Sequence, residues 1–153
     1  MIVVSDTSPL TALLTVGGEE LLRLLFHEVV VPRAVGEELL RSHPSLPVWL
    51  RVEMVREPMR VREFVLVVDR GEAEAIELAK ELHADRLLID DRKGRRLAAQ
   101  QGIPVIGLLG VILLARRRHL IPSARVLLDR LRHEAGMYLS DDIVNAALAT
   151  VGE

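Results

Sequence analysis

Short runs of β-branched residues alternate along this chain with longer stretches of helical spacing, and this alternation constrains the fold most strongly. It is typical of βαβ units, in which helices join parallel strands. The runs Ile2–Val4 and Leu87–Ile89 are continuously apolar instead of alternating with polar residues. Strands of that kind are buried on both faces. The pattern therefore predicts a three-layer α/β/α domain around a mostly parallel sheet of about five strands.

Individual elements can be placed from apolar runs, helical spacing and the positions of Pro and Gly. We expect strands at Met1–Ser5, Glu28–Val31, Val52–Val55, Arg86–Ile89 and Pro104–Ile106. We expect helices from Ser8, an N-cap before Pro9, and at Gly18–Leu25, Arg33–Arg41, Gly71–Leu82, Arg92–Gln101 and near 108–118, 123–134 and 141–150. Phe64–Val68 is compatible with an extended or a helical conformation.

Length and composition indicate one domain with a sizeable core. The chain has 153 residues, 50% of them hydrophobic, and a formal net charge of -2, which together exclude intrinsic disorder. We expect a single domain over residues 1–153, in which the helices of residues 116–153 are candidates for assembly or partner binding. Because the chain has no cysteine, disulfides, zinc–thiolate sites and thiol nucleophiles are excluded.

No segment has the pattern of a signal peptide or a membrane span. The N-terminal segment lacks a basic leader, and Asp6 interrupts its apolar run. The longest nearly apolar run, Ile103–Ala115, is short and contains Pro104. We therefore expect a cytoplasmic protein.

Carboxylates directly follow two of the expected strands. Asp6 follows the first strand, and Asp90 and Asp91 follow the strand that ends at Ile89. Ligand sites of open parallel sheets lie beyond the carboxyl ends of the strands. One such aspartate can simply cap the next helix, but two strands that end in this way favour a shared site.

Two expected helices bring further acids toward the same edge. Glu38 lies beside the buried stripe of its helix, where the alternative is a side chain that faces solvent. Glu72 lies in the first turn of the next long helix, where the alternative is simple pairing with the helix N-terminus. Glu74, two residues further on, either shares the site or faces solvent.

These acids are the candidate ligands of a metal ion. A cluster of Asp6, Glu38, Glu72 and Asp90 or Asp91 would repel itself unless a cation neutralised it. Oxygen ligands without cysteine favour Mg²⁺ or Mn²⁺. Such ions activate water and stabilise charge on a phosphoryl group, so the sequence favours phosphodiester hydrolysis.

Four segments, taken in order, resemble PIN-domain proteins, and their VapC-like branch most closely. A later stretch, Val105–Leu113, is similar to the segment that follows the last strand in that branch, so that the resemblance spans residues 1 to about 115. The four segments are Asp6–Leu10, Pro32–Leu39, Gly71–Ile76 and Leu88–Arg95.

The resemblance implies a Mg²⁺- or Mn²⁺-dependent endoribonuclease, often the toxin of a type II toxin–antitoxin pair and often a homodimer. It implies that Asp6, Glu38 and Glu72 are metal ligands. The fourth ligand position is matched by both Asp90 and Asp91. Thr7 and Ser8 stand at the hydroxyl positions that orient the first aspartate or a metal-bound water. A small antitoxin protein would neutralise such a toxin by covering the acidic site.

A basic cluster and two alternative functions complete the sequence-based interpretation. Arg92, Lys93 and Arg95 suit sequence-independent contacts with RNA phosphates, although the same pattern fits a solvated helix face. The main alternative function is a non-catalytic PIN-like binding or assembly module, which metal affinity would distinguish. A phosphatase with an aspartyl nucleophile needs a second acid two residues after the first, where this chain has Ser8.

Overall fold

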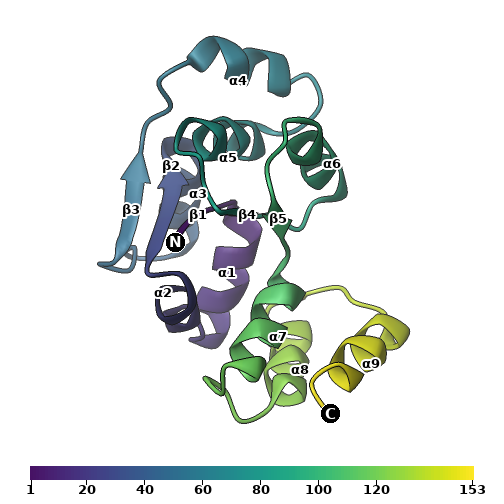
Figure 1. Cartoon of the computed structure of the whole chain (residues 1–153). Coiled ribbons are helices and arrows are strands. Elements are labelled where there is room, and N and C mark those ends of the chain that lie inside the picture. Colours follow the sequence, from purple (N-terminus) through teal and green to yellow (C-terminus); the bar gives the residue numbers. More distant parts are fainter.

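The computed structural model describes all residues from Met1 to Glu153 and has a five-stranded sheet at its centre. The strand order is β3-β2-β1-β4-β5, and all neighbouring strands are parallel (Figure 1). The strands are β1 Ile2–Ser5, β2 Glu28–Pro32, β3 Leu50–Glu53, β4 Arg86–Leu88 and β5 Val105–Ile106. The predicted parallel sheet is therefore confirmed.

Nine helices surround this sheet. They are α1 Thr7–Val16, α2 Glu20–Phe26, α3 Arg33–Ser42, α4 Pro58–Phe64, α5 Arg70–Glu81, α6 Arg92–Gln100, α7 Leu108–Arg117, α8 Ala124–Glu134 and α9 Asp141–Ala149. Most bounds agree with the expected ones to within two residues. No helix combines the length and the apolar character needed to cross a membrane.

Helix α1 begins two residues earlier than the sequence predicts. Its N-cap residue is Asp6, with an extended backbone at φ -79° and ψ 172°, and not Ser8. Pro9 consequently lies in the first turn, where its missing N–H removes no helical hydrogen bond. Because a single residue joins β1 to α1, Asp6 is held at the carboxyl edge of the sheet.

The expected bounds are least accurate in the segment after α3. β3 starts and ends two residues early, because its register pairs Val29 with Leu50 and Pro32 with Glu53. The chain then leaves the sheet, since the backbone N–H groups of residues 56 and 57 donate to the Glu81 carboxylate at 2.7 and 3.1 Å. Phe64 ends helix α4, and residues 65–67 form a turn.

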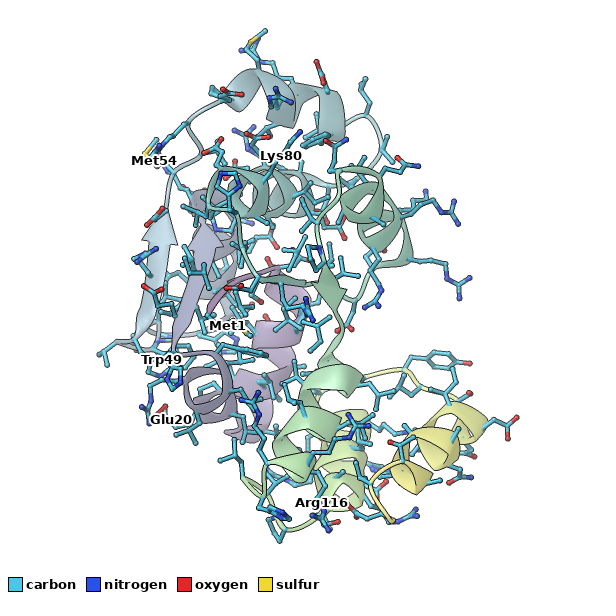
Figure 2. All side chains as sticks on the ribbon, in the orientation of Figure 1. Met1, Glu20, Trp49, Met54, Lys80 and Arg116 are labelled. Atoms are coloured by element: carbon cyan, nitrogen blue, oxygen red, sulfur yellow. The ribbon has the colours of Figure 1, made fainter.

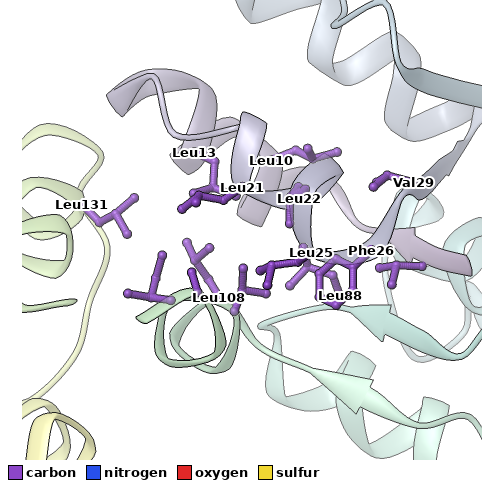
Figure 3. Packing of buried hydrophobic residues seen from close by; sticks show 14 of the residues in the cluster. Leu10, Leu13, Leu21, Leu22, Leu25, Phe26, Val29, Leu88, Leu108 and Leu131 are labelled. Carbon is purple, nitrogen blue, oxygen red and sulfur yellow. The ribbon is translucent and has the colours of Figure 1, made fainter. Parts of the chain in front are cut away.

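The strands divide the core into two clusters, because successive strand residues point to opposite faces of the sheet. Val3, Val29, Val31 and Leu88 pack with α1, α2, α7 and α8 on one face (Figure 3). Val4, Val30, Leu87 and Ile89 pack with α4, α5 and α6 on the other. This double burial explains why the strands are continuously apolar and confirms the three-layer architecture.

The last helices belong to the first of these cores. Leu128 and Leu131 of α8 and Val144 and Leu148 of α9 lie in the same cluster as the strand residues. The Glu153 carboxylate also accepts hydrogen bonds at the start of α8, from the Ala124 N–H at 2.7 Å and the Ser123 hydroxyl at 2.8 Å. Residues 116–153 are thus packed onto the sheet domain, and their role in assembly stays a prediction.

Candidate metal centre at the carboxyl ends of the strands

Asp6 is a buried carboxylate without a basic partner. Its backbone N–H donates to the Leu88 carbonyl at 2.9 Å, which fixes the residue between β1 and β4. The side chain does not cap α1, and the residue is only 5% exposed. Burial and, to a smaller extent, the charges of Glu72, Asp69 and Glu38 together raise the pKa of Asp6 from 3.8 to about 7, against a lowering hydrogen bond from the Thr7 backbone. No basic side chain offsets the buried charge.

Glu72 is the second buried acid of the cluster, at the start of α5. It forms a capping box with Asp69: the Glu72 N–H donates to Asp69 Oδ1 at 2.8 Å, and the Asp69 N–H donates to Glu72 Oε2 at 3.2 Å. Burial, followed by the charges of Asp69, Asp91 and Glu38, raises the pKa of Glu72 from 4.5 to about 7. Glu72 therefore caps a helix and lies in the acidic cluster at the same time.

Glu38 reaches the cluster from α3. Its Oε1 atom lies 2.8 Å from the point that a Cβ on Gly71 would occupy. Only glycine at that position leaves the Glu38 carboxylate in place beside the first turn of α5. Glu38 raises the pKa of both Asp6 and Glu72, so its charge lies close to both.

Asp90 and Asp91 point to different neighbours. Asp90 Oδ1 accepts the Leu108 N–H at 2.9 Å, at the N-terminus of α7. Asp91 Oδ2 accepts the Gly94 N–H at 2.9 Å and caps α6. Of the two, only Asp91 is among the charges that raise the pKa of Glu72. The structure thus places Asp91 beside the cluster and Asp90 toward α7.

The three supporting candidates differ in their surroundings. The Thr7 hydroxyl is buried next to Asp6 and has no hydrogen-bond partner, whereas Ser8 is exposed. Glu74 neither joins the cluster nor faces solvent. Instead its carboxylate accepts the Ala34 N–H at 3.1 Å and pairs with Arg70 at 3.1 Å, which ties α5 to the start of α3.

Sequence reasoning missed Asp69. Its charge raises the pKa of both Asp6 and Glu72, so it belongs to the acidic cluster. The signal was present in the sequence, because an aspartate three residues before a glutamate has the spacing of a capping box.

The three basic candidates fall into two kinds. Arg95 is half-buried, and its Nη1 atom donates to the Ile89 carbonyl at 3.0 Å, so it supports the end of β4. Arg92 and Lys93 are exposed in the first turn of α6 and take part in no ion pair. These two side chains are therefore available to a polyanion.

The chemistry of the cluster fits a divalent cation. It offers carboxylate oxygens from several helices and strand ends, together with the Thr7 hydroxyl, which has no hydrogen-bond partner. No basic side chain neutralises Asp6. Hard cations such as Mg²⁺ and Mn²⁺ prefer oxygen ligands of this type. No three Asp, Glu or His side chains are close enough together to hold an ion in this arrangement.

Comparison with known proteins gives one match. The family model of DUF3368, described as a PIN domain, matches residues 2–153. The match includes α8 and α9, which lie beyond the residues that carry the resemblance in the sequence. No curated protein matches the chain.

Proposed function

Because the chain belongs to the PIN-domain family, we propose that it is a Mg²⁺- or Mn²⁺-dependent endoribonuclease and the toxin of a type II toxin–antitoxin pair. Its fold is of the nuclease type that this family shares. The observation that carries the proposal is Asp6, a carboxylate 5% exposed among other acids and without a basic partner. An isolated buried charge is costly unless a cation pairs with it.

The residues of the cluster would have distinct roles. Asp6, Glu38, Glu72 and Asp91 would hold the ion, and Asp91 is favoured over Asp90 because its charge acts on Glu72. A bound ion of this kind lowers the pKa of water and stabilises negative charge on a phosphoryl group. The unpaired Thr7 hydroxyl is placed to donate to Asp6 or to a water beside it.

Substrate binding would fall to other side chains. Arg92 and Lys93 follow the acidic cluster on α6 and are free to contact RNA phosphates without regard to sequence. Arg95, in contrast, acts as a positioning residue, because its guanidinium holds the end of β4.

The alternative function is a binding or assembly module without catalysis. The carboxylates of Glu72, Asp90 and Asp91 each accept a backbone hydrogen bond at a helix start, a structural role that suits such a module. The Asp6 side chain does not cap α1 and has no basic partner. A module that never binds a cation would therefore gain stability from a neutral residue there. Asp6 therefore favours the nuclease.

The proposal is tested by cleavage of a mixed RNA pool. We expect the wild-type chain to cut RNA with Mn²⁺ and not with EDTA, and we expect Asp6→Asn to abolish cutting with Mn²⁺. Asp129→Asn, an exposed aspartate on α8, is the matched control and should cut like the wild type. Undiminished cleavage by the Asp6→Asn variant would contradict the proposal.

The partners follow from the same proposal. We propose an antitoxin that covers the acidic cluster and lays an apolar helix on α2 and α3, where Leu24 and Leu40 are 43% and 52% exposed. We also propose a homodimer in the cytoplasm. A pull-down with the product of the neighbouring open reading frame tests the first point, and analytical ultracentrifugation tests the second. Recovery of no partner, or sedimentation as a monomer, would contradict the respective point.

A further inference from the structure

A recess of about 330 Å³ lies near the acidic cluster, since its lining includes Ser8, two residues after Asp6, and Asp90, the neighbour of Asp91 in the chain. Ser8 and Asp90 lie at its polar end, and Ala12, Leu108 and the loop of residues 135–139 form the rest of its wall. We propose that this recess is a nucleobase subsite, which receives one unpaired base of an RNA strand while Tyr138 stacks on that base. The inference rests on the proposed function in that it takes RNA as the ligand.

The loop of residues 135–139 presents a single aromatic ring on a fixed backbone. Met137 and Leu139 pack against the core, and the Met137 N–H donates to the Leu131 carbonyl at 3.1 Å. Between these two anchors Tyr138 is 91% exposed and yet lines the recess. Because Tyr138 contributes almost nothing to the core, its exposed ring has no evident structural role.

Tyr138 is also the only aromatic side chain of the chain that is free to stack. Phe26 and Phe64 are 2% and 5% exposed and belong to the two cores. Trp49 lies beside Glu20 in Figure 2, where its Nε1 atom donates to the Glu20 carboxylate at 2.9 Å. An aromatic ring placed next to a candidate phosphodiester site suits base stacking, which is the usual way proteins hold single-stranded nucleic acid.

The walls and the charge of the recess select a base over a phosphate. Its sides are apolar, whereas Asp90 is an acceptor at one end and would repel a phosphate group. Its volume lies at the lower end of the range for ligand pockets, which suits one ring system better than a whole nucleotide. A base inside a duplex is stacked and paired, so the subsite predicts a preference for single-stranded RNA.

The subsite is tested by equilibrium binding in EDTA, where no cleavage occurs. The probes are a fluorescently labelled short RNA of random sequence and an abasic ribose-phosphate chain of the same length and charge. Stacking predicts that Tyr138→Ala weakens binding of the RNA roughly 5- to 100-fold, with no effect on the abasic chain. Tyr138→Phe should keep the wild-type affinity, because the ring and not the hydroxyl stacks. Leu66→Ala, which removes another side chain that is 85% exposed, is the matched control.

Two results would overturn the subsite. One is an unchanged RNA affinity in Tyr138→Ala. This result would refute the subsite even if the variant lost affinity for a protein partner. The other is an equal loss of affinity for the RNA and the abasic chain, which would indicate a general effect on the surface. The failure of the subsite and that of the nuclease are separable. If Asp6→Asn loses cleavage with Mn²⁺ while Tyr138→Ala cleaves RNA with an unchanged KM, the nuclease proposal stands and the subsite is refuted. If binding depends on the base and on Tyr138 but no cleavage occurs, the subsite stands and the nuclease proposal is refuted.

Discussion

Asp6 differs from the other acids of the site in what its side chain does for the fold. The carboxylates of Asp90, Asp91 and Glu72 each accept a hydrogen bond from a backbone N–H at the start of a helix. Replacing any of them would alter a helix start together with the site. The Asp6 carboxylate caps nothing, so its removal tests the chemistry of the site with little effect on the backbone.

Asp6→Asn should stabilise the metal-free protein at and above neutral pH. Because folding raises the pKa of Asp6 from 3.8 to about 7, the folded chain binds a proton that the unfolded chain has lost between these values. The stabilisation that comes from this bound proton is fully present below the ordinary pKa of 3.8 and is lost as the pH rises through about 7. We expect the free energy of unfolding of Asp6→Asn to exceed that of the wild type by about 1–3 kcal/mol at alkaline pH.

Urea denaturation in EDTA across this pH range measures the effect. Part of the pH dependence should remain in Asp6→Asn, because the pKa of Glu72 is also raised to about 7. Asp129→Asn should unfold like the wild type at every pH. A variant Asp6→Asn that is less stable than the wild type at alkaline pH would show that the carboxylate has a structural partner after all.

Gly71→Ala should weaken metal binding without unfolding the chain. Its Cβ would lie 2.8 Å from Glu38 Oε1, and the flexible carboxylate would have to move away from the cluster. We expect Mn²⁺ affinity and RNA cleavage to fall about 10-fold, the scale on which displaced supporting groups act. Calorimetric titration with Mn²⁺ measures this. Gly18→Ala is the control, since its Cβ meets the nearest side chain at 3.5 Å, an ordinary contact. Equal affinity in Gly71→Ala would remove Glu38 from the site.

The sequence predicts single acids better than it predicts their partners. Asp6 and the pair at 90 and 91 stand out because they directly follow apolar strands. The choice between Asp90 and Asp91 is invisible locally, since it depends on the Leu108 N–H, which arrives from a distant part of the chain. Glu74 is likewise directed by the Ala34 N–H at the start of another helix.

At the scale of elements, the first turn of α6 is the candidate contact for RNA. We expect the double variant Arg92→Ala/Lys93→Ala to bind single-stranded RNA more weakly. The slope of the logarithm of its binding constant against the logarithm of the salt concentration should be smaller in magnitude by roughly 1.4. Both side chains are exposed and unpaired, so the fold should be unaffected. Binding measured over a series of salt concentrations checks this. Arg41→Ala, an exposed arginine at the end of α3, should leave the slope unchanged. An unchanged slope in the double variant would place the RNA elsewhere.

The start of α8 depends on the Glu153 side chain. The hydrogen bond from the Ala124 N–H, followed by that from the Ser123 hydroxyl, lowers the pKa of Glu153 from 4.5 to about 2. The resulting stability is present above pH 4.5 and is lost as the pH falls toward 2. We therefore expect Glu153→Gln to melt at a lower temperature than the wild type at neutral pH, and the difference to shrink in strong acid.

Thermal unfolding followed by circular dichroism measures this difference. Glu63→Gln, which changes an exposed glutamate, should melt like the wild type. A constant difference at all pH values would mean that the charge of Glu153 does not matter.

Elements with strong local signals were predicted well. The apolar spacing after Gly71 predicts a helix at 71–82, and α5 spans Arg70–Glu81. The segment between α3 and α5 was predicted less well, because the Glu81 carboxylate, far along the chain, holds the backbone N–H groups of Arg56 and Glu57. A contact of that range has no signature in the local sequence.

At the scale of the whole molecule, the parallel sheet explains why acids from distant segments meet. All five strands end at the same edge. The helices that start there bring further carboxylates, so the topology assembles Asp6, Glu38, Glu72 and Asp91 around one edge. This topology could be predicted from the doubly buried strands. The recess beside it could not, because α1, α7 and the loop of residues 135–139 form it together.

The central claim is that the acidic cluster around Asp6 binds a divalent cation. Calorimetric titration with Mn²⁺ at neutral pH, on the wild type, Asp6→Asn and Asp129→Asn, tests it most directly. We expect the wild type and Asp129→Asn to bind Mn²⁺ with release of protons, because the pKa values of Asp6 and Glu72 lie at about 7 and bound carboxylates ionise. We expect Asp6→Asn to lose this binding. A wild type that binds no Mn²⁺, or an Asp6→Asn variant that binds it equally well, would contradict the claim.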